Sequence, residues 1–330
     1  MTATADAASG TAAPRRPLVS VVVPAFNAAA HLGDALGSVR AQTGAFEMEV
    51  IVVDDGSADD TPRVAQAHGG VHLLRLDANR GPSAARNAGI AAAQGTYVAF
   101  LDADDCWPAG SLAARVDVLQ RQPDAAMVFG DCRQFDENGA HEHTLFEDGA
   151  LGAAAWGTLG TLPGAYERLL DENMITTGTV VVRRADLAAA GGFAEDLRLV
   201  EDLDLWLRLA RRHPIAWCPQ VCLLRRRHAA NLSRDPDAMS LAYLEVLRRQ
   251  AEQQSDPAFR RRLVALAARE QLQLADRALQ QHRAADALRW AGHSTRSQPS
   301  LRALWRIAQA ALLRLGVRPG AMRDGQSPGP

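Results

Sequence analysis

The sequence contains no lysine, so all 36 of its strongly basic side chains are arginines. This absence excludes sites built on the lysine of a phosphate-binding P-loop or on a lysine that forms a Schiff base. Long apolar runs are missing as well, and no stretch of about 18 uncharged apolar residues is available to span a membrane as a helix. The chain has only four cysteines, without C-x-x-C spacing, so we expect buried, reduced thiols rather than a zinc site.

The composition is otherwise that of a globular protein, with 47% apolar and 22% charged residues, which excludes a wholly disordered chain. Residues 1–17 are rich in small residues and lack the apolar segment of a secretory signal, so we interpret them as a disordered leader and expect a cytoplasmic protein. Residues 1–240 hold 21 Arg against 31 acidic residues, whereas residues 241–330 hold 15 Arg against 7. An acidic body is therefore followed by a basic tail.

Short runs rich in Val and Ile alternate with helical spacing at the start of the chain. The predicted strands span residues 18–25, 49–55, 71–76 and 97–101, and the predicted helices span residues 28–42, 59–67 and 83–93. Such alternation is typical of an α/β fold with a mostly parallel, doubly wound sheet.

The alternation loosens in the second part of the chain. We predict helices at 111–122, 184–190 and 200–212, strands at 126–129, 179–183 and 216–224, and loops over most of 131–173. After residue 236 the sequence is rich in Ala, Leu, Arg and Gln and has no strand signal. We therefore predict one α/β domain over residues 18–235 and an α-helical C-terminal region over residues 236–330.

Aspartates follow the second and fourth predicted strands, as Asp54-Asp55 and as Asp102-Ala103-Asp104-Asp105. Ligands of open α/β sheets bind beyond the carboxyl ends of the strands, and clustered carboxylates there repel each other unless a cation or a polar ligand lies among them. Helix caps or turns are the alternative interpretation. Asp-x-Asp oxygens suit Mg²⁺ or Mn²⁺, and Mg²⁺ commonly completes its shell with substrate phosphates, so we expect a diphosphate-bearing substrate. No G-x-G-x-x-G motif follows the first strand, which disfavours a dinucleotide dehydrogenase.

The motifs, taken in order, resemble those of family 2 glycosyltransferases over about residues 18–235. They read VSVVVPAFN, EVIVVDDGSADDT, NRGPSAARNAGI, YVAFLDADD, GGF and EDLDLWLRL. The resemblance implies the glycosyltransferase A-type fold, with a nucleotide-binding half to about residue 107 and an acceptor half over 108–235. It also implies an inverting, Mn²⁺- or Mg²⁺-dependent transfer from a nucleotide diphosphate sugar, in the first place a UDP-sugar, to a glycan or lipid-linked acceptor hydroxyl. We expect no nucleic-acid partner.

The resemblance also assigns roles on the donor side. The nucleotide-binding residues that it implies are Pro24, Phe26, Asn27, Asp54, Asp55, Asn79, Gly81, Arg86, Asn87, Asp102, Ala103 and Asp104. Phe26 stands where the family has Tyr, so stacking on the base is kept while a phenol hydrogen bond is lost. Asp55 would accept a hydrogen bond from uracil, and Asp104 would contact ribose and metal. Asp105 is the alternative metal ligand, and His228, in a segment similar to the family's terminal flap, would contact metal or phosphate.

On the acceptor side, the motif Glu201-Asp202 precedes an amphipathic helix. An inverting transfer needs one general base for the acceptor hydroxyl, and the resemblance makes Asp202 that base and Glu201 the residue that orients it or the acceptor. An acidic pair that complements the helix dipole is the alternative interpretation. Further acceptor or flap residues implied by the resemblance are Thr177, Gly178, Trp206 and Arg227, of which Trp206 has a core position as its alternative.

Two other classes of function are compatible with acids at strand ends. A non-catalytic nucleotide-sugar-binding relative is disfavoured because both acidic motifs are intact. A nucleotidyltransferase usually needs a Gly-rich, basic triphosphate loop after its first strand, and here that turn reads PAFNAAAH, without Gly, Arg or Lys.

The tail contains an amphipathic stretch over residues 301–317. Its apolar positions are Leu301, Leu304, Trp305, Ala308, Leu312 and Leu315, and its Arg positions are Arg302, Arg306 and Arg314. One interpretation is a helix packed on the catalytic domain. The other is an interfacial helix on anionic lipid, which would make the protein peripheral at the inner face of the membrane and bring it to a lipid-linked acceptor.

Overall fold

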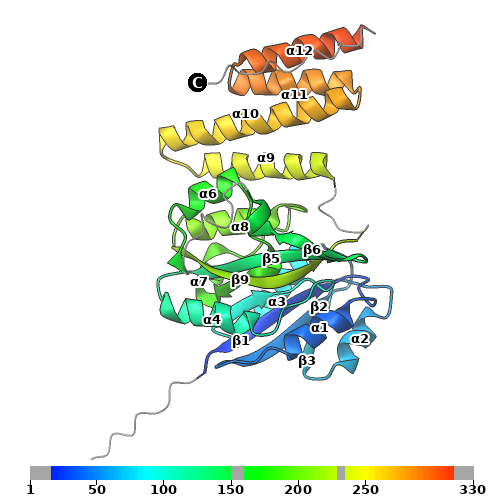
Figure 1. Cartoon of the computed structure of the whole chain (residues 1–330), viewed down its shortest axis with the longest axis vertical. Helices are drawn as coiled ribbons and strands as arrows, with labels where there is room; N and C mark the ends of the chain where they lie inside the picture. The colour runs from blue at the N-terminus through cyan, green and yellow to red at the C-terminus, as the bar shows by residue number, and fades with distance from the viewer. Residues whose placement is uncertain (1–15, 150–159, 229–234, 316–330) are drawn as a thin grey trace, which may run out of the picture. The chain divides into compact units, whose positions relative to one another are not determined.

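A computed structural model of the chain describes residues 16–149, 160–228 and 235–315 (Figure 1). Almost all of the expected leader, residues 1–15, lies outside the described residues. The chain divides into two compact units, residues 1–231 and 232–330.

The first unit is built on a mixed sheet whose strand order is β3-β2-β1-β4-β8-β5-β9-β7, with β6 added beside β5. The strands are β1 Leu18–Ala25, β2 Glu47–Asp54, β3 Val71–Arg75, β4 Tyr97–Phe100, β5 Met127–Asp136, β6 Gly139–Thr144, β7 Gly160–Thr161, β8 Val181–Arg183 and β9 Ile215–Arg226. Within the described ranges, β1 to β5 and β9 run in one direction and β6, β7 and β8 run against them. This confirms the predicted α/β fold with a sheet of mostly parallel strands.

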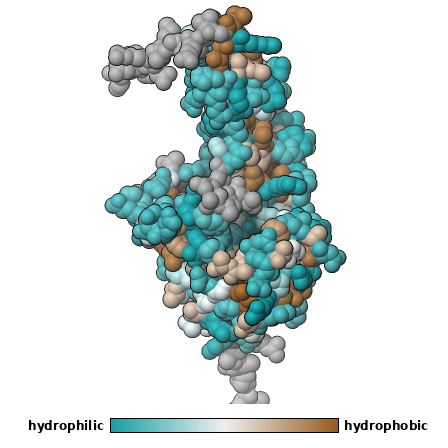
Figure 2. All heavy atoms as spheres, turned by 90° about the vertical axis from the view of Figure 1, so that its right-hand side faces the viewer, coloured by the Kyte–Doolittle hydropathy of each residue, from teal (hydrophilic) through white to brown (hydrophobic). Residues whose placement is uncertain are grey.

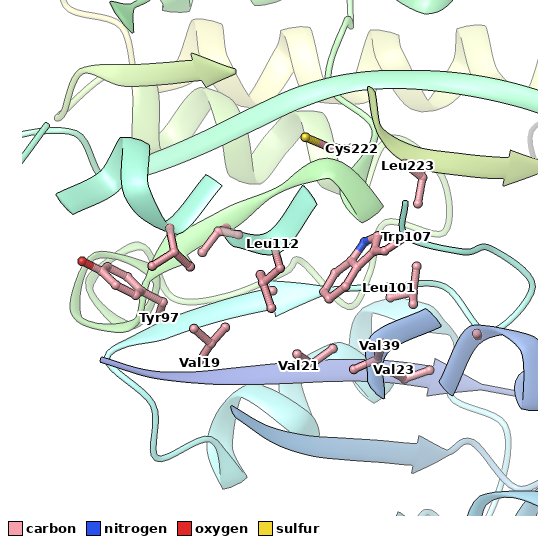
Figure 3. Packing of buried hydrophobic residues seen from close by; sticks show 14 of the residues in the cluster. Val19, Val21, Val23, Val39, Tyr97, Leu101, Trp107, Leu112, Cys222 and Leu223 are labelled. Carbon is pink, nitrogen blue, oxygen red and sulfur yellow. The ribbon is translucent and has the colours of Figure 1, made fainter. Parts of the chain in front are cut away.

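Helices cover both faces of this sheet. They are α1 Leu32–Arg40, α2 Thr61–Ala67, α3 Pro82–Ala92, α4 Ser111–Arg121, α5 Leu145–Asp148, α6 Ala165–Asp171, α7 Arg184–Ala190 and α8 Glu201–Ala210, and a 3₁₀ turn spans Thr177–Thr179. Alternate residues of β1, Val19, Val21 and Val23, point into a core that α1 and α4 close (Figure 3). Val22 points to the opposite face, where a Cβ added at Gly89 of α3 would lie 2.3 Å from its Cγ1. Only glycine lets α3 approach the strand so closely.

The prediction of loops over most of residues 131–173 is wrong for a large part of that segment. β5 continues to Asp136 and pairs with β6, and α5, β7 and α6 follow among the described residues. The side chains of β6 from Gly139 to His143 are exposed, so this hairpin lacks the apolar alternation by which a strand is recognised in a sequence.

The second unit consists, over its described residues, of the helices α9 Pro236–Glu252, α10 Pro257–Gln280, α11 Ala284–Ser297 and α12 Leu301–Arg314. The carboxylates of Asp235 and Asp256 and the hydroxyl of Ser300 cap the first turns of α9, α10 and α12. The helical C-terminal region is thus confirmed. None of the described helices is both long enough and apolar enough to cross a membrane.

Candidate active site

The candidate site lies where the parallel strands β1, β2 and β4 end. The last residue of β1, Ala25, is in register with Asp54 at the end of β2. Just beyond, Asn27 takes a left-handed backbone conformation with φ 47°. Its N–H donates to Ser57 Oγ at 2.9 Å, and its Oδ1 accepts from the Ala58 N–H at 2.9 Å. Asn27 therefore ties the turn after β1 to the turn after β2, and Phe26 is left exposed beside this joint.

Both aspartates at the end of β2 are buried and hold the surrounding loops. Asp54 accepts from the Ser57 N–H at 3.1 Å, and its Oδ2 lies 3.1 Å from Arg75 Nε. The two oxygens of Asp55 accept from the backbone N–H groups of Arg80 and Gly81, at 2.9 and 2.8 Å. Each oxygen keeps a second lone pair, and the contact of Asp55 with a uracil base stays a prediction.

A hydrogen bond between a side chain and the backbone stabilises the loop that follows β3. Asn79 Oδ1 accepts from the Gly81 N–H at 3.1 Å, and Gly81 has φ 91°, which favours glycine. At Gly56, in the neighbouring turn, an added Cβ would lie 2.8 Å from the backbone of Ala78. The predicted Asn79 and Gly81 therefore lie against the turn that carries Asp55.

Arg86 joins the two acidic motifs. Its Nη2 donates to Asp102 Oδ1 at 2.7 Å, and its Nη1 donates to Glu201 Oε1 at 2.8 Å. The guanidinium is buried and lies over the ring of Phe193, 5.3 Å from its centroid. Burial opposes the charge, but the two carboxylates outweigh it and raise the pKa of Arg86, so the side chain stays cationic. The motif after β4 and the motif at the start of α8 thus belong to one site.

Asn87, expected beside the ribose and diphosphate, holds the turn before α8. Its Nδ2 donates to the Phe193 carbonyl and its Oδ1 accepts from the Phe193 N–H, both at 2.9 Å. Gly192 has φ 70°, and an added Cβ there would lie 2.6 Å from Asn87 Oδ1. The structure gives Asn87 this positioning role, and its contact with a donor stays a prediction.

The aspartates after β4 meet the end of β9. Asp104 Oδ2 lies 2.8 Å from His228 Nε2, and both side chains are partly exposed. Buried Asp105 accepts from the Arg226 N–H at 2.8 Å, and Ala103, which stands between Asp102 and Asp104 in the sequence, is buried. Burial, with Asp102 and Asp104 close by, raises the pKa of Asp105 well above its ordinary value.

Asp104, Asp105 and His228 are the residues that the sequence predicts as ligands of a cation. Over the described ranges, no three His, Cys, Asp or Glu side chains are grouped to hold a metal ion. The structure does bring together Asp104 and His228, two of the three predicted ligands, while the Asp105 carboxylate faces the backbone of Arg226. A partly exposed oxygen and nitrogen donor pair beside further carboxylates fits Mn²⁺ or Mg²⁺ in its chemistry.

His31 is a neighbour of this pair that the sequence did not reveal. Its ring stacks on His228 with 5.7 Å between centroids and 30° between planes. The signal in the sequence was the aromatic polar residue in PAFNAAAH, a few positions beyond the turn at the same sheet edge.

Neighbouring groups fix both carboxylates of the acidic pair Glu201-Asp202 at the start of α8. Asp202 Oδ1 accepts from the Leu203 N–H at 2.7 Å, and its Oδ2 accepts from the Thr177 hydroxyl at 3.2 Å. Burial raises the pKa of Asp202, and it raises that of Glu201 despite the opposing charge of Arg86. A carboxyl whose pKa is raised by burial suits a general base.

The turn that carries Thr177 rests on a second group of residues that the sequence did not point to. The carbonyl of Gly178 accepts from Trp107 Nε1 at 2.8 Å and from Arg115 Nη1 at 3.2 Å. Arg115 is fully buried, with its guanidinium 4.5 Å from the centroid of the Trp107 ring. Gly178 is therefore a backbone support of Thr177.

The remaining predicted acceptor or flap residues are Trp206 and Arg227. Trp206 is fully buried and packs edge-on against Phe193, with 6.0 Å between ring centroids. The assignment of Trp206 to the acceptor surface is thus corrected, because a side chain without exposed area cannot contact an acceptor. The backbone of Arg227 donates to the Phe135 carbonyl at 2.8 Å, which fixes the start of the expected flap on β5.

The mostly parallel sheet, with acids at the ends of its parallel strands, agrees with the glycosyltransferase A-type fold that the resemblance implies. The sequence profile of the family "Glycosyl transferase family 2" matches residues 20–189, just over half of the chain. The chain therefore belongs to glycosyl transferase family 2, and it is a glycosyltransferase.

Relatives and solved structures agree with this assignment. The putative teichuronic acid biosynthesis glycosyltransferase TuaG of Bacillus subtilis (strain 168) is 28% identical over 220 residues, or 66% of this chain and 81% of TuaG. S. aureus TarS 1-349 in complex with UDP-GlcNAc has a TM-score of 0.67 at 17% identity, over 91% of this chain and 92% of that one. The mannosyltransferase PcManGT from Pyrobaculum calidifontis, in complex with GDP-Man and Mn²⁺, has a TM-score of 0.56 at 22% identity, over 92% and 81%. At these identities the structures show a shared fold.

Proposed function

We propose that this glycosyltransferase is inverting and metal-dependent, and that it moves a sugar from a nucleotide diphosphate sugar, in the first place a UDP-sugar, to a hydroxyl group of a glycan or lipid-linked acceptor. The observation that carries the proposal is the Arg86 bridge between Asp102 and Glu201. It joins Asp102, one of the predicted donor-side acids, to Glu201, the neighbour of the predicted base Asp202. The named ligands of the two structural neighbours, UDP-GlcNAc and GDP-Man, support a nucleotide-sugar donor.

In this proposal, the donor half extends to about residue 107 and the acceptor half to about residue 235. The nucleotide lies at the ends of β1 and β2, where exposed Phe26 offers its ring to the base. The backbone from Arg80 to Gly81, held by Asp55, and the start of α3 border the ribose and diphosphate.

The general base is Asp202. It takes the proton of the acceptor hydroxyl while the oxygen forms its bond to the anomeric carbon and the nucleoside diphosphate departs. The Thr177 hydroxyl and the Leu203 N–H hold both oxygens of the carboxylate in place. Glu201, fixed by Arg86, is a positioning residue for this pair.

Asp104 and His228 would hold the divalent cation, with Asp105 next to them. When bound, the cation would neutralise the charge that develops on the leaving diphosphate. Because that charge is met by the metal, no second carboxyl is needed as an acid.

Removal of divalent cations is expected to abolish donor turnover, and added Mn²⁺ is expected to restore it. Asp104→Asn should lose the stabilisation of the fold that UDP-GlcNAc with Mn²⁺ gives in a thermal-shift experiment, which amounts to about 2.7 kcal/mol at a hundredfold excess over Kd. The control is Asp117→Asn, which changes a carboxylate on the outer surface of α4 that pairs with Arg121. Full turnover in EDTA would exclude the metal.

The dependence of kcat/KM on pH is expected to report Asp202. The base must be unprotonated, and burial raises its pKa, so activity should fall on acidification at a higher pH than an ordinary aspartate would give. The Thr177 hydroxyl lowers this pKa. Thr177→Val should therefore move the acidic limb to still higher pH, whereas Thr177→Ser, which keeps the hydroxyl, should leave it in place. An acidic limb that is identical in all three proteins would rule out Asp202 as the titrating group.

A further inference from the structure

The last described helix, α12, carries its large apolar side chains on the outside. Leu301, Leu304, Trp305, Leu312 and Leu315, the last directly after the helix, are 86%, 52%, 46%, 41% and 78% exposed. At 100° per residue these five positions, with exposed Ala308, fall in one stripe about 100° wide. Figure 2 shows hydrophobic surface (brown) at the top of the picture, where the last helices of the chain lie.

The opposite face of α12 holds the helix in the second unit. Ala303 and Ala310 on that face are fully buried. Beside them, Arg306 Nε lies 2.5 Å and Arg302 Nη2 lies 2.9 Å from the two carboxylate oxygens of Asp276 on α10. Small residues and the ion pair of Arg306 thus face inward, and large apolar residues face outward. This is the reverse of the usual arrangement for a helix of a soluble protein.

We propose that this apolar stripe of α12 docks on a lipid bilayer surface, into which its leucines and Trp305 insert. The inference concerns binding alone and does not depend on the reaction proposed above. A helix that lies in the membrane interface has such a stripe, with Trp at the level of the headgroups.

Two other possible partners of the apolar stripe, a second copy of the chain and residues 316–330, fit it less well. A stable protein interface uses about 20–30 residues on each side. The stripe offers six positions, five of them on a helix of 14 residues that is about 21 Å long. A second copy of the chain therefore gains little area here. The chain that follows, residues 316–330, is rich in Gly and Pro and has only Val317 and Met322 as larger apolar residues, so its composition does not complement the stripe.

The ion pairs with Asp276 also refine the expectation from the sequence. The basic balance of residues 241–330 predicts attraction to anionic lipid, but two of the three Arg side chains of α12 are already paired within the unit. Exposed Arg314 and the net positive charge of residues 241–330 favour anionic bilayers. The apolar side chains provide most of the binding free energy. Binding should therefore survive moderate salt, unlike binding by charge alone.

The test uses the full chain and co-sedimentation with vesicles of phosphatidylcholine, with and without phosphatidylglycerol, at low and high salt. The variant Leu304→Gln/Leu312→Gln should bind at least about tenfold more weakly, since each exposed leucine loses its burial in lipid. The matched control is Leu241→Gln on α9, where the leucine is as exposed as Trp305, at 46%. Circular dichroism shows whether each variant keeps its helices.

We expect the wild type and the Leu241→Gln variant to bind vesicles at both salt concentrations. The double variant should lose this binding. Equal binding by all three proteins, or no binding to any vesicle, would overturn the proposal. Sedimentation velocity without lipid tests whether the stripe binds a second copy of the chain. Self-association that the double variant abolishes would assign the stripe to a second copy instead.

Discussion

Replacing Asp202 by asparagine is expected to lower the rate of sugar transfer by about 10²- to 10⁴-fold, which is the usual effect of losing a positioned base. Asparagine keeps the shape, and its Oδ1 can still accept from the Leu203 N–H while its NH2 group faces the Thr177 oxygen as a donor, but it cannot take a proton. The affinity for the nucleotide sugar should barely change, because the carboxylate is proposed to act on the acceptor side of the anomeric carbon. Turnover and donor affinity are therefore measured on the same variant.

The control for this experiment is Glu201→Gln, which changes the neighbouring carboxylate that Arg86 holds. A positioning residue should give a smaller loss of kcat and should keep the acidic limb of the pH profile, moved to lower pH because a negative charge beside Asp202 is removed. Near-normal turnover by Asp202→Asn would remove Asp202 from the mechanism and move attention to Glu201. Loss of donor binding would instead mean that the pair holds the site together.

Replacing Arg86 by methionine is expected to give the largest loss of stability, about 3–5 kcal/mol in the free energy of unfolding. The side chain is buried, so its removal leaves the carboxylates of Asp102 and Glu201 near each other without a cation. Arg86→Lys keeps a charge but loses the planar fork that reaches both partners, so it should recover stability only in part.

The matched control is Arg80→Gln, because Arg80 and Glu195 form an exposed ion pair of similar length, 2.9 Å. Exposed pairs contribute about 0–1 kcal/mol, so this variant should unfold close to the wild type in urea. Adding Glu201→Gln to Arg86→Met should restore part of the lost stability, since one of the unpaired charges is removed. Wild-type stability and turnover in Arg86→Met would contradict the bridging role.

Much of the fold could be predicted because it rests on local patterns. β1 spans Leu18–Ala25, the same residues as the strand predicted from the run LVSVVVPA, which is mostly apolar and β-branched. The hairpin of β5 and β6 could not be predicted, because β6 is stabilised by backbone pairing and its side chains are mostly exposed. A strand is recognised in a sequence by the alternation of buried apolar and exposed polar side chains, and β6 has almost no buried side chains.

The site was predictable in its motifs and less so in its contacts. Asp104 and His228 were expected together on the basis of family order, and the structure brings them together. The partners of Arg86 are 16 and 115 positions away in the sequence, and no local pattern encodes such pairings. The support of the Thr177 turn by Arg115 likewise depends on a long-range contact, to the Gly178 carbonyl.

In the tail, the sequence predicts an amphipathic helix but does not predict which face of that helix packs inward. The helical spacing from Leu301 to Leu315 predicted an amphipathic helix, and α12 is one. The pattern does not say which face packs. That depends on Asp276, which pairs with Arg302 and Arg306 from a different helix.

The most direct measurement is the release of nucleoside diphosphate from a panel of UDP- and GDP-sugars by the full chain in the presence of Mn²⁺. The account predicts UDP release from at least one UDP-sugar, no release in EDTA, and release slowed by about 10²-fold or more in Asp202→Asn. Phosphorus NMR of the same reactions identifies the product. Pyrophosphate as the product, or UDP release that neither EDTA nor Asp202→Asn affects, would contradict the account.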